Sequence, residues 1–340
     1  MIRGRIFTAG AVVLIAVSML TSIVWHSDAY AAQTSNVTGD ALKISPVRWD
    51  FSVDPGTTKV IDFYIQNLTS VPAILHPAVN DFTAATDESG APHVILDETQ
   101  FAPSHSLKKF VKPMSDFTVQ PHELKNIKAT VVIPKDAAGG GYYGAIRFSP
   151  ANAEGSKNVN LSASIGSLVL LRVNGTVSEQ LSVASFDVRQ QPQDSKEAAK
   201  VGAFFTSGKN LKSVVRFKNG GNIQVGPFGT VTLKKGKKTL SQVQINNVDP
   251  RGVVLPDSTR RFDVDVTKVG SFGKYTLEGN FGYGTTGQLL TAKTSFYVVP
   301  VPILLLAGIV LLFILFAIFV LPRMVRSYNK RVIRRASRRR

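Results

Sequence analysis

Residues that could bind a metal or activate water are few in this sequence, and they are widely spaced. The 340 residues include no cysteine, so disulfides, thiolate metal sites and thiol nucleophiles are all excluded. Four histidines lie outside the long apolar segments, and no two of them are two or four residues apart: His76, His93, His105 and His122. This spacing favours unrelated surface or loop histidines, with a zinc site assembled across the fold as the alternative.

Carboxylates and nucleophiles give no stronger signal. Asp263 and Asp265 fall on one face of an expected strand, and the stretch TDESG at 86–90 is typical of a polar turn, but neither has the ligand density of a calcium loop. The sequence contains neither a Gly-x-Ser-x-Gly elbow nor a P-loop. We therefore expect a protein that is not an enzyme, has no catalytic or metal-binding residues and uses no cofactor. A metal-dependent hydrolase is the weakest alternative.

A cluster of lysines forms a short stretch that could attract an anionic polymer. Lys234, Lys235, Lys237 and Lys238 surround Gly236 between two apolar strands, in the pattern of a hairpin tip. Exposed lysines at such a tip often protect a sheet edge from pairing with another chain. The functional alternative is contact with an anionic wall polymer or with the membrane surface.

Three aromatic residues are candidates for stacking on the faces of sugar rings: Trp49, Tyr142 and Tyr143. Aromatic side chains on strands pack more often in the core or against a cross-strand neighbour. Glycan contact is the functional hypothesis for these three residues, and packing is the structural alternative.

Positive charge is concentrated at the C-terminal end of the chain. The formal net charge is +17 at pH 7, and residues 323–340 contain nine Lys or Arg and no acid. Such a run can indicate nucleic acid binding, but this one follows Ile303–Leu321, 19 residues that are all apolar apart from Gly308. We therefore predict a transmembrane helix over 299–322 and a cytoplasmic tail over 323–340, with no nucleic acid partner. The basic residues that flank this membrane anchor are Arg323, Arg326, Lys330, Arg331, Arg334 and Arg335.

The N-terminal segment predicts export. Arg3 and Arg5 precede an apolar run from Ile6 to Val24, and the residues that end at Ala31 fit the small-x-small cleavage rule. We predict a signal peptide over 1–31 that is cleaved after Ala31, and an uncleaved anchor is the alternative because the apolar run is long. Together with the positive-inside rule, this predicts a single-pass protein with a large external part.

The external part alternates apolar and polar residues with a period of two, which predicts antiparallel strands with one buried face. The clearest examples are VIDFYIQN from Val60, RFDVDVT from Arg261 and KYTLEGNFGY from Lys274, and they are separated by glycine turns. We predict an all-β fold of two tandem immunoglobulin-like sandwiches, over 32–177 and 178–298. The sequence shows no convincing internal repeat.

Several of these stretches resemble one known family. ISPVRWDFSVDPGTTKVIDFYIQN, VVIPKDAAGGGYYGAIRFSP and IGSLVLLRVNG resemble the first domain of WxL-interacting proteins of Gram-positive bacteria. VVLPDSTRRFDVDVTKVGSFGKYTLEGNFGYG and TSFYVVP, followed by a span and a basic tail, resemble the second domain and its anchor. The resemblance covers 44–340. It implies two immunoglobulin-like domains on the outer face of the membrane, the first associated with peptidoglycan and the second with host or partner proteins.

The leading hypothesis is a non-catalytic binding protein held in a bacterial cell membrane by one helix. Its external sandwiches are expected to bind peptidoglycan, another wall polymer or an envelope surface protein, and no small-molecule substrate is expected. The runner-up is a structural or assembly subunit that packs on partner proteins of the envelope.

Overall fold

The structure of the chain is a computed structural model that describes residues 41–150, 164–191, 200–326 and 329. The predicted signal peptide, with its cleavage site at Ala31, lies outside these residues. So do four of the predicted anchor-flanking residues, namely Lys330, Arg331, Arg334 and Arg335. The described residues from Ala41 onward belong to one compact unit.

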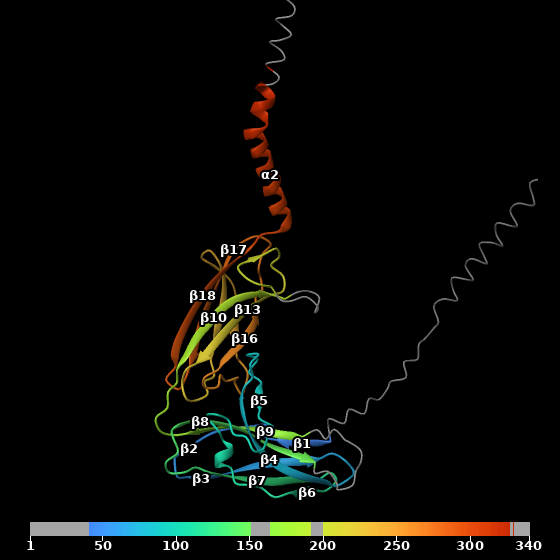
Figure 1. The fold of residues 1–340 in the computed structure, drawn as a ribbon, viewed down its shortest axis with the longest axis vertical. Coiled ribbons are helices and arrows are strands. Elements are labelled where there is room, and N and C mark those ends of the chain that lie inside the picture. The colour runs from blue at the N-terminus through green and yellow to red at the C-terminus, as the bar shows by residue number, and fades with distance from the viewer. Residues whose placement is uncertain (1–40, 151–163, 192–199, 327–328, 330–340) are drawn as a thin grey trace, which may run out of the picture. The chain divides into compact units, whose positions relative to one another are not determined.

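The first sandwich is built from nine strands (Figure 1). Their bounds are β1 (Leu42–Ser45), β2 (Arg48–Val53), β3 (Thr58–Asn67), β4 (Ala73–Ala84), β5 (Pro92–Val94), β6 (Phe117–Val119), β7 (Leu124–Val132), β8 (Gly140–Pro150) and β9 (Ile165–Val173), with a short 3-10 helix, η2 (Lys108–Phe110), before β6. One sheet has the order β1-β3-β7, and the facing sheet has the order β2-β9-β8-β4-β5, with β6 also paired to β4. All pairs are antiparallel except β2 with β9, which run parallel.

The second sandwich also has nine strands and two sheets. The bounds are β10 (Leu181–Gln190), β11 (Lys200–Val201), β12 (Phe204–Phe205), β13 (Leu211–Asn219), β14 (Phe228–Lys235), β15 (Lys238–Ile245), β16 (Thr259–Asp265), β17 (Gly273–Tyr283) and β18 (Gln288–Val298). The sheet orders are β11-β10-β13-β16 and β12-β18-β17-β14-β15. Among the described residues, no sheet contains strands of both sandwiches, and the boundary between 177 and 178 stays a prediction.

The two sandwiches share one topology. The order β1-β3-β7 corresponds to β10-β13-β16, and the order β2-β9-β8-β4-β5 corresponds to β12-β18-β17-β14-β15. The parallel pair also recurs, since β12 runs parallel to β18 as β2 does to β9. The fold is therefore a structural repeat that is not visible in the amino-acid sequence.

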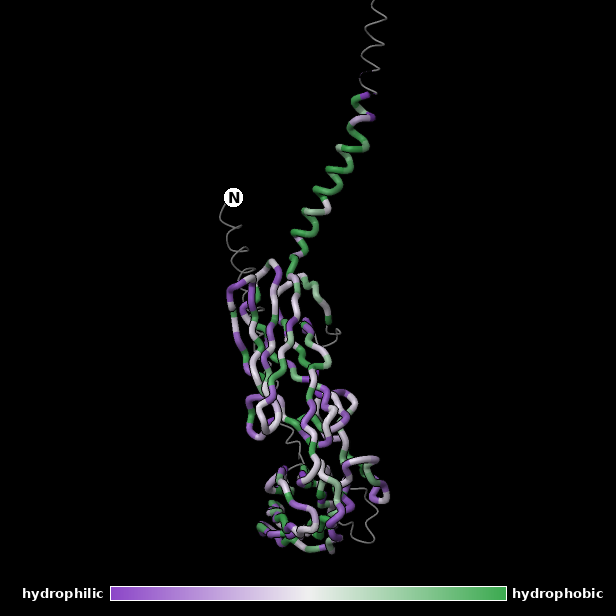
Figure 2. The backbone as a smooth tube through the Cα atoms, turned by 90° about the vertical axis from the view of Figure 1, so that its left-hand side faces the viewer, coloured by the Kyte–Doolittle hydropathy of each residue, from purple (hydrophilic) through white to green (hydrophobic). Residues whose placement is uncertain are grey.

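Each sandwich encloses its own core, as the period-two alternation predicts. On β3 the residues Ile61, Phe63 and Ile65 are fully buried, and on β17 Tyr275 and Leu277 are buried in the same way. Figure 2 shows apolar and polar residues alternating along the strands of both sandwiches. Because burial of apolar surface is the main favourable term in folding, this alternation fixes which face of each strand points inward. The all-β, immunoglobulin-like fold class is confirmed.

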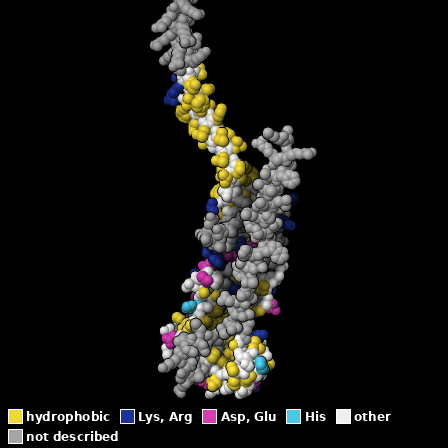
Figure 3. Space-filling model, turned by 90° about the vertical axis from the view of Figure 1, so that its right-hand side faces the viewer, with side chains coloured by type: hydrophobic (Ala, Val, Ile, Leu, Met, Phe, Trp, Pro, Cys, Tyr) yellow, Lys and Arg dark blue, Asp and Glu magenta, His cyan; other side chains and the backbone are white. Residues whose placement is uncertain are grey.

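A single long apolar helix, α2 (Val301–Phe319), ends the described chain. The helix begins after Pro300, and the helical segment to which it belongs continues to Arg326. Among the described residues, this is the one helix that is long and apolar enough to cross a membrane. Its side chains are exposed on every side. Figure 3 shows hydrophobic side chains along its length. Arg323 and Arg326 follow it directly, and Arg323 Nη1 donates a hydrogen bond to the Phe319 carbonyl oxygen (2.9 Å).

Candidate functional site

The three aromatic residues proposed to contact glycans do not share a surface. Trp49 packs on the core of the first sandwich, with its ring perpendicular to that of Phe51 at 6.3 Å. Tyr142 lies against Phe110 at 4.7 Å, and partial burial raises the pKa of its hydroxyl. Tyr143 is only 2% exposed. The three side chains therefore make the packing contacts that the structural alternative describes. Glycan contact by these residues stays a prediction.

The four lysines of the predicted hairpin tip separate into two kinds. The hairpin itself is present, because β14 and β15 pair up to Lys235 and Lys238. Lys234 is on the strand and binds the Glu278 carboxylate at 2.5 Å, where Lys293 also binds at 3.1 Å. The hydrogen bond from Lys234, followed by that from Lys293, lowers the pKa of Glu278. The other three lysines are exposed, so their ammonium groups are accessible to a ligand: Lys235, Lys237 and Lys238.

The histidines make separate contacts. His76 Nδ1 lies 2.6 Å from Asp116 Oδ1, and His105 Nδ1 lies 2.6 Å from the Gly141 carbonyl oxygen. Within the described residues, no group of three or more His, Asp or Glu side chains could hold a metal ion. The Asp263 carboxylate contacts Arg261 Nε at 3.2 Å, which is the environment of a surface ion pair.

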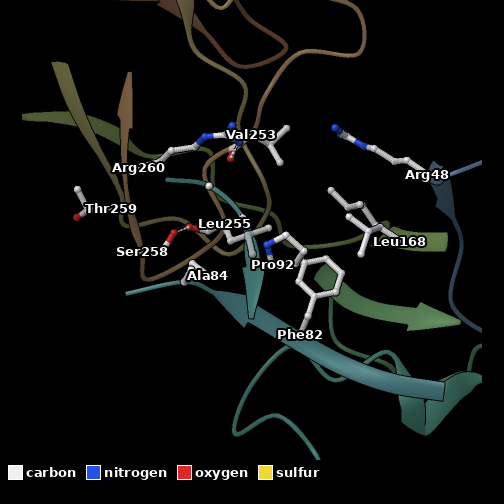
Figure 4. A pocket seen from close by; sticks show the side chains of 14 residues that line it. Arg48, Phe82, Ala84, Pro92, Leu168, Val253, Leu255, Ser258, Thr259 and Arg260 are labelled. Atoms are coloured by element: carbon white, nitrogen blue, oxygen red, sulfur yellow. Dashed lines mark hydrogen bonds between the residues drawn. The ribbon is translucent and has the colours of Figure 1, made fainter. Parts of the chain in front are cut away.

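A small pocket lies where the two sandwiches meet (Figure 4). Its floor is apolar and combines Phe82 and Leu168 from the first sandwich with Val253 and Leu255 from the second. The cavity volume is about 90 Å³, which leaves room for a few water molecules or one small apolar group. The sequence did not predict this pocket, because its walls come from segments that are far apart in the chain.

Two arginines stand at the rim of this junction pocket, and both guanidinium groups are only partly satisfied. Arg260 donates to the Val253 carbonyl oxygen (2.8 Å) and lies over the Phe262 ring at 5.0 Å. Burial, with a smaller contribution from the nearby charge of Arg48, lowers the pKa of Arg260. The Nε atoms of Arg48 and Arg260 are buried and have no hydrogen-bond partner among the described residues. Both arginines line the pocket, so its rim is positively charged.

Polar bonds close the junction around the pocket. Arg216 Nε binds the Glu88 carboxylate at 2.6 Å, and the Arg261 backbone N–H donates to the Glu88 carbonyl oxygen (2.8 Å). The Tyr143 hydroxyl donates to Gln224 Oε1 at 2.9 Å. Burial raises the pKa of Tyr143, so this hydroxyl stays protonated and remains a donor. Together these bonds join the two sandwiches.

A larger groove lies on the first sandwich, with a volume of about 670 Å³. The residues that line this first-sandwich groove include His76, Glu98, Phe101, Lys108, Lys109 and Met114. The exposed Phe101 ring has the Lys108 ammonium 4.7 Å and the Lys109 ammonium 5.9 Å from its centre. An aromatic face beside two cations is the combination that suits a sugar polymer with anionic substituents.

The loop that carries this groove is held by a buried carboxylate. Asp81 is fully buried on β4, and its two oxygens accept the backbone N–H groups of Ala102 and Lys108, each at 2.9 Å. Asn80 adds a bond to the Ile95 carbonyl oxygen (2.8 Å). The groove is thus a fixed feature of the fold. Its sequence signal is the Asn80-Asp81 pair within a mostly apolar strand.

Comparisons with known proteins find similarity to solved structures only. No protein-family model and no curated protein matches the chain. Similar solved structures include the chaperone–tip adhesin complex of CFA/I fimbriae, with 10% identity, a TM-score of 0.39 and coverage of 76% of this chain and 99% of that chain. The class 5 fimbriae chaperone CfaA has 10% identity, a TM-score of 0.37 and coverage of 76% and 100%.

A third similar structure is the Salmonella enterica SafA pilin in complex with the SafB chaperone, with 13% identity and a TM-score of 0.33. That match covers 76% of this chain and 95% of that chain. At such low identities and TM-scores, these likenesses carry no information about what this chain binds.

Proposed function

We propose that this chain is a non-catalytic binding protein anchored in a bacterial cell membrane by α2, with both sandwiches outside the cell. The observation that carries the proposal is α2 itself, whose 19 residues from Val301 to Phe319 are apolar and exposed on all sides. At 1.5 Å per residue the helix is about 28 Å long, close to the hydrocarbon thickness of a bilayer. A water-exposed helix of this kind would leave a large apolar surface unburied, and a bilayer removes that cost.

The orientation follows from charge. Arg323 and Arg326 come directly after the apolar stretch, and the tail beyond them carries no acid. Basic residues next to a span stay on the cytoplasmic side, so the sandwiches that precede the span lie outside. Such an orientation requires export of the N-terminal part, which agrees with the signal peptide predicted over 1–31.

The ligand we propose is peptidoglycan or another polymer of the cell wall, bound in the first-sandwich groove. Phe101 and Lys109 supply an aromatic face and a cation on a loop that Asp81 holds in place. A preorganised site loses little conformational entropy on binding. The proposal agrees with the resemblance to WxL-interacting proteins, in which the first domain is the one associated with peptidoglycan.

The test is sedimentation of the full chain, in detergent, with purified peptidoglycan sacculi. Phe101→Ala combined with Lys109→Gln should weaken binding about tenfold, which corresponds to about 1.4 kcal/mol. The matched control, Phe204→Ala with Lys237→Gln, makes the same chemical changes on the second sandwich and should leave binding unchanged. If the unaltered chain does not sediment with sacculi at any salt concentration, the peptidoglycan ligand is wrong. If the groove variant binds like the control, the site is wrong.

A second candidate function, the assembly subunit that binds a partner protein, is favoured by one apolar surface. Val71, Ile74 and Leu124 are large apolar side chains exposed at the same end of the first sandwich. The Asn67 side chain donates a hydrogen bond to the Val71 carbonyl oxygen, and the neighbouring Gln66 is paired with Leu124. Ile74 is paired with Thr118, next to Val119, which also accepts a hydrogen bond from Asn67. A photo-crosslinking residue placed at 124 should then yield a discrete protein adduct in native membranes that a probe at Val248 does not yield. Identical adducts from both positions would exclude this candidate.

A further inference from the structure

One end of the second sandwich differs from the rest of its surface, and it is the end from which α2 leaves. The strand β18 ends at Val298, and only two residues separate it from the start of the helix at Val301. Four segments meet there and define the helix-proximal end: 200–212, 235–238, 265–274 and 296–300. The strand register places them together, because Phe205 and Gly273 are both paired with Val298.

Exposed aromatic side chains gather at the helix-proximal end. The Phe204 ring is 64% exposed and stacks on the Tyr297 ring, with centroids 5.0 Å apart and planes 12° apart. Phe272, directly before β17, is 53% exposed. A large exposed aromatic normally costs solvation free energy, but at the boundary between lipid and water such rings are favoured.

Lysines surround these rings. The described residues of the helix-proximal end include a single acid, Asp265, and eight lysines, of which all but Lys212 are exposed: Lys200, Lys209, Lys212, Lys235, Lys237, Lys238, Lys268 and Lys274. Asp265 lies 3.8 Å from Lys212, so its carboxylate does not neutralise the charge of the exposed lysines. The Lys274 ammonium lies 5.7 Å from the centre of the Tyr297 ring, and Lys235 Nζ donates to the Phe272 carbonyl oxygen (2.9 Å).

The opposite end of the same sandwich has the reverse charge. The segments 178–181, 219–228, 246–258 and 283–288 meet there, and they contain three acids and one base: Glu179, Asp249, Asp257 and Arg251. The separation follows the direction toward α2, which is the direction of the membrane in the proposed function.

We propose that the helix-proximal end is a lipid-binding surface that seats the second sandwich on an anionic membrane. The rings of Phe204, Phe272 and Tyr297 enter the headgroup layer, and the lysines bind the phosphates of anionic lipids. Lysine stems can lie along the apolar rings while the ammonium groups reach the phosphates. This inference rests on the proposed anchoring by α2, which brings the surface within a few residues of the bilayer. The hairpin Lys235–Lys238 then acts on the membrane and not on the wall polymer.

The absence of cysteine makes a direct test straightforward with the full chain. Ser271→Cys places a fluorescent label beside Phe272, and Val248→Cys places one at the opposite end, where the side chain is 65% exposed. Each labelled protein is reconstituted in vesicles of phosphatidylglycerol or of phosphatidylcholine that contain headgroup-spin-labelled lipid in both leaflets. Quenching of the label reports contact with the headgroup layer.

In phosphatidylglycerol, the label at 271 should be quenched at least about threefold more than in phosphatidylcholine, and the label at 248 should not respond to composition. The difference should decrease as salt rises from 0.1 M to 1 M, where the screening length falls from about 10 Å to about 3 Å. A sandwich that is merely tethered beside the bilayer predicts equal quenching at 271 in both lipids, and that result would overturn the proposal.

Charge variants locate the contact. Replacing Lys235, Lys237 and Lys238 by Gln should reduce quenching at 271 to the phosphatidylcholine level. The control changes three exposed lysines of the first sandwich to Gln and should have no effect on quenching at 271: Lys59, Lys112 and Lys135.

Flotation after alkaline extraction tests anchoring by α2 separately from the lipid-binding surface. A protein that does not float contradicts anchoring by α2, whereas a protein that floats without quenching at 271 contradicts only the lipid-binding surface.

Discussion

Asn67 and Asn219 make the same four hydrogen bonds at the same place in the two sandwiches. In each, the side-chain amide donates to the carbonyl oxygen four residues on, Val71 or Ile223, at 2.8 Å. It also donates to the opposing segment, at 3.2 Å to Val119 and 2.9 Å to Val254.

The amide oxygen accepts the backbone N–H two residues on, from Thr69 or Gly221. The backbone N–H of each asparagine donates to Glu123 or Ser258 at 3.0 Å. Both side chains are fully buried, so each asparagine closes the turn after its strand from inside the protein.

Removing either side chain should destabilise the sandwich that contains it. Asn67→Ala and Asn219→Ala each leave buried backbone groups without partners, and we expect a loss of about 2–4 kcal/mol in the free energy of unfolding. Denaturant unfolding of the full chain in detergent measures it. Asn174→Ala is the control, because Asn174 bonds Asp54 on the exposed surface and should cost less than about 1 kcal/mol. Equal losses for all three variants would contradict a special role for the buried pair.

The junction between the sandwiches should depend on Phe82. This side chain packs on Tyr143 and Leu170 of the first sandwich and belongs to the cluster that includes Val253 and Leu255 of the second. Phe82→Ala should raise amide hydrogen exchange at least about tenfold at the N–H groups that bond across the junction, because the local opening free energy falls by more than about 1.4 kcal/mol.

The amides to follow are those of Gly141, which donates to Asn222, and of Arg261, which donates to Glu88. Phe63→Ala removes a core ring of the first sandwich that contacts Phe148 and lies away from the junction. It should not raise exchange selectively at these two amides. Selective exchange in the Phe63 variant, and none in the Phe82 variant, would show that the junction is held elsewhere.

Acid should weaken the second sandwich partly through Glu278. Lys234 and then Lys293 lower the pKa of this carboxyl below its ordinary value in the folded protein. A depressed carboxyl pKa stabilises the fold above the unfolded-state pKa, and this contribution is lost as pH falls through the lowered folded-state pKa. The unfolding temperature should therefore fall less steeply between about pH 5 and pH 3 in Glu278→Gln than in the unaltered chain. Parallel pH profiles of the two proteins would refute the assignment.

The fold class was predictable from sequence because burial acts locally on strands. The alternate spacing of Ile61, Phe63 and Ile65 predicts which face of the strand is buried. The glycine turn at Gly236 predicts the hairpin. The structural repeat was not predictable from the sequence. Asn67 and Asn219 bond mainly to backbone groups, and every residue type carries these groups, so the bonds require no particular side chains nearby.

The candidate sites were harder to predict from the sequence than the fold, for a related reason. The junction pocket and the first-sandwich groove are assembled by long-range pairing, so Phe82 and Phe101 look ordinary in sequence. The lysines of the helix-proximal end are scattered over 200–274, and only the register of β12, β17 and β18 brings them to one end. The sequence cluster at Lys234–Lys238 identified part of that surface and included Lys234, which is held by Glu278.

The central claim, that α2 spans the membrane with the sandwiches outside, is tested most directly by cysteine labelling of intact cells whose wall has been removed. The variants are Val248→Cys in the second sandwich and Ser337→Cys in the basic tail, each in the full chain, which has no other cysteine. With a membrane-impermeant maleimide, position 248 should label before lysis and position 337 only after lysis. Labelling of 337 in intact cells, or protection of 248 until lysis, would contradict the topology on which the proposed function rests.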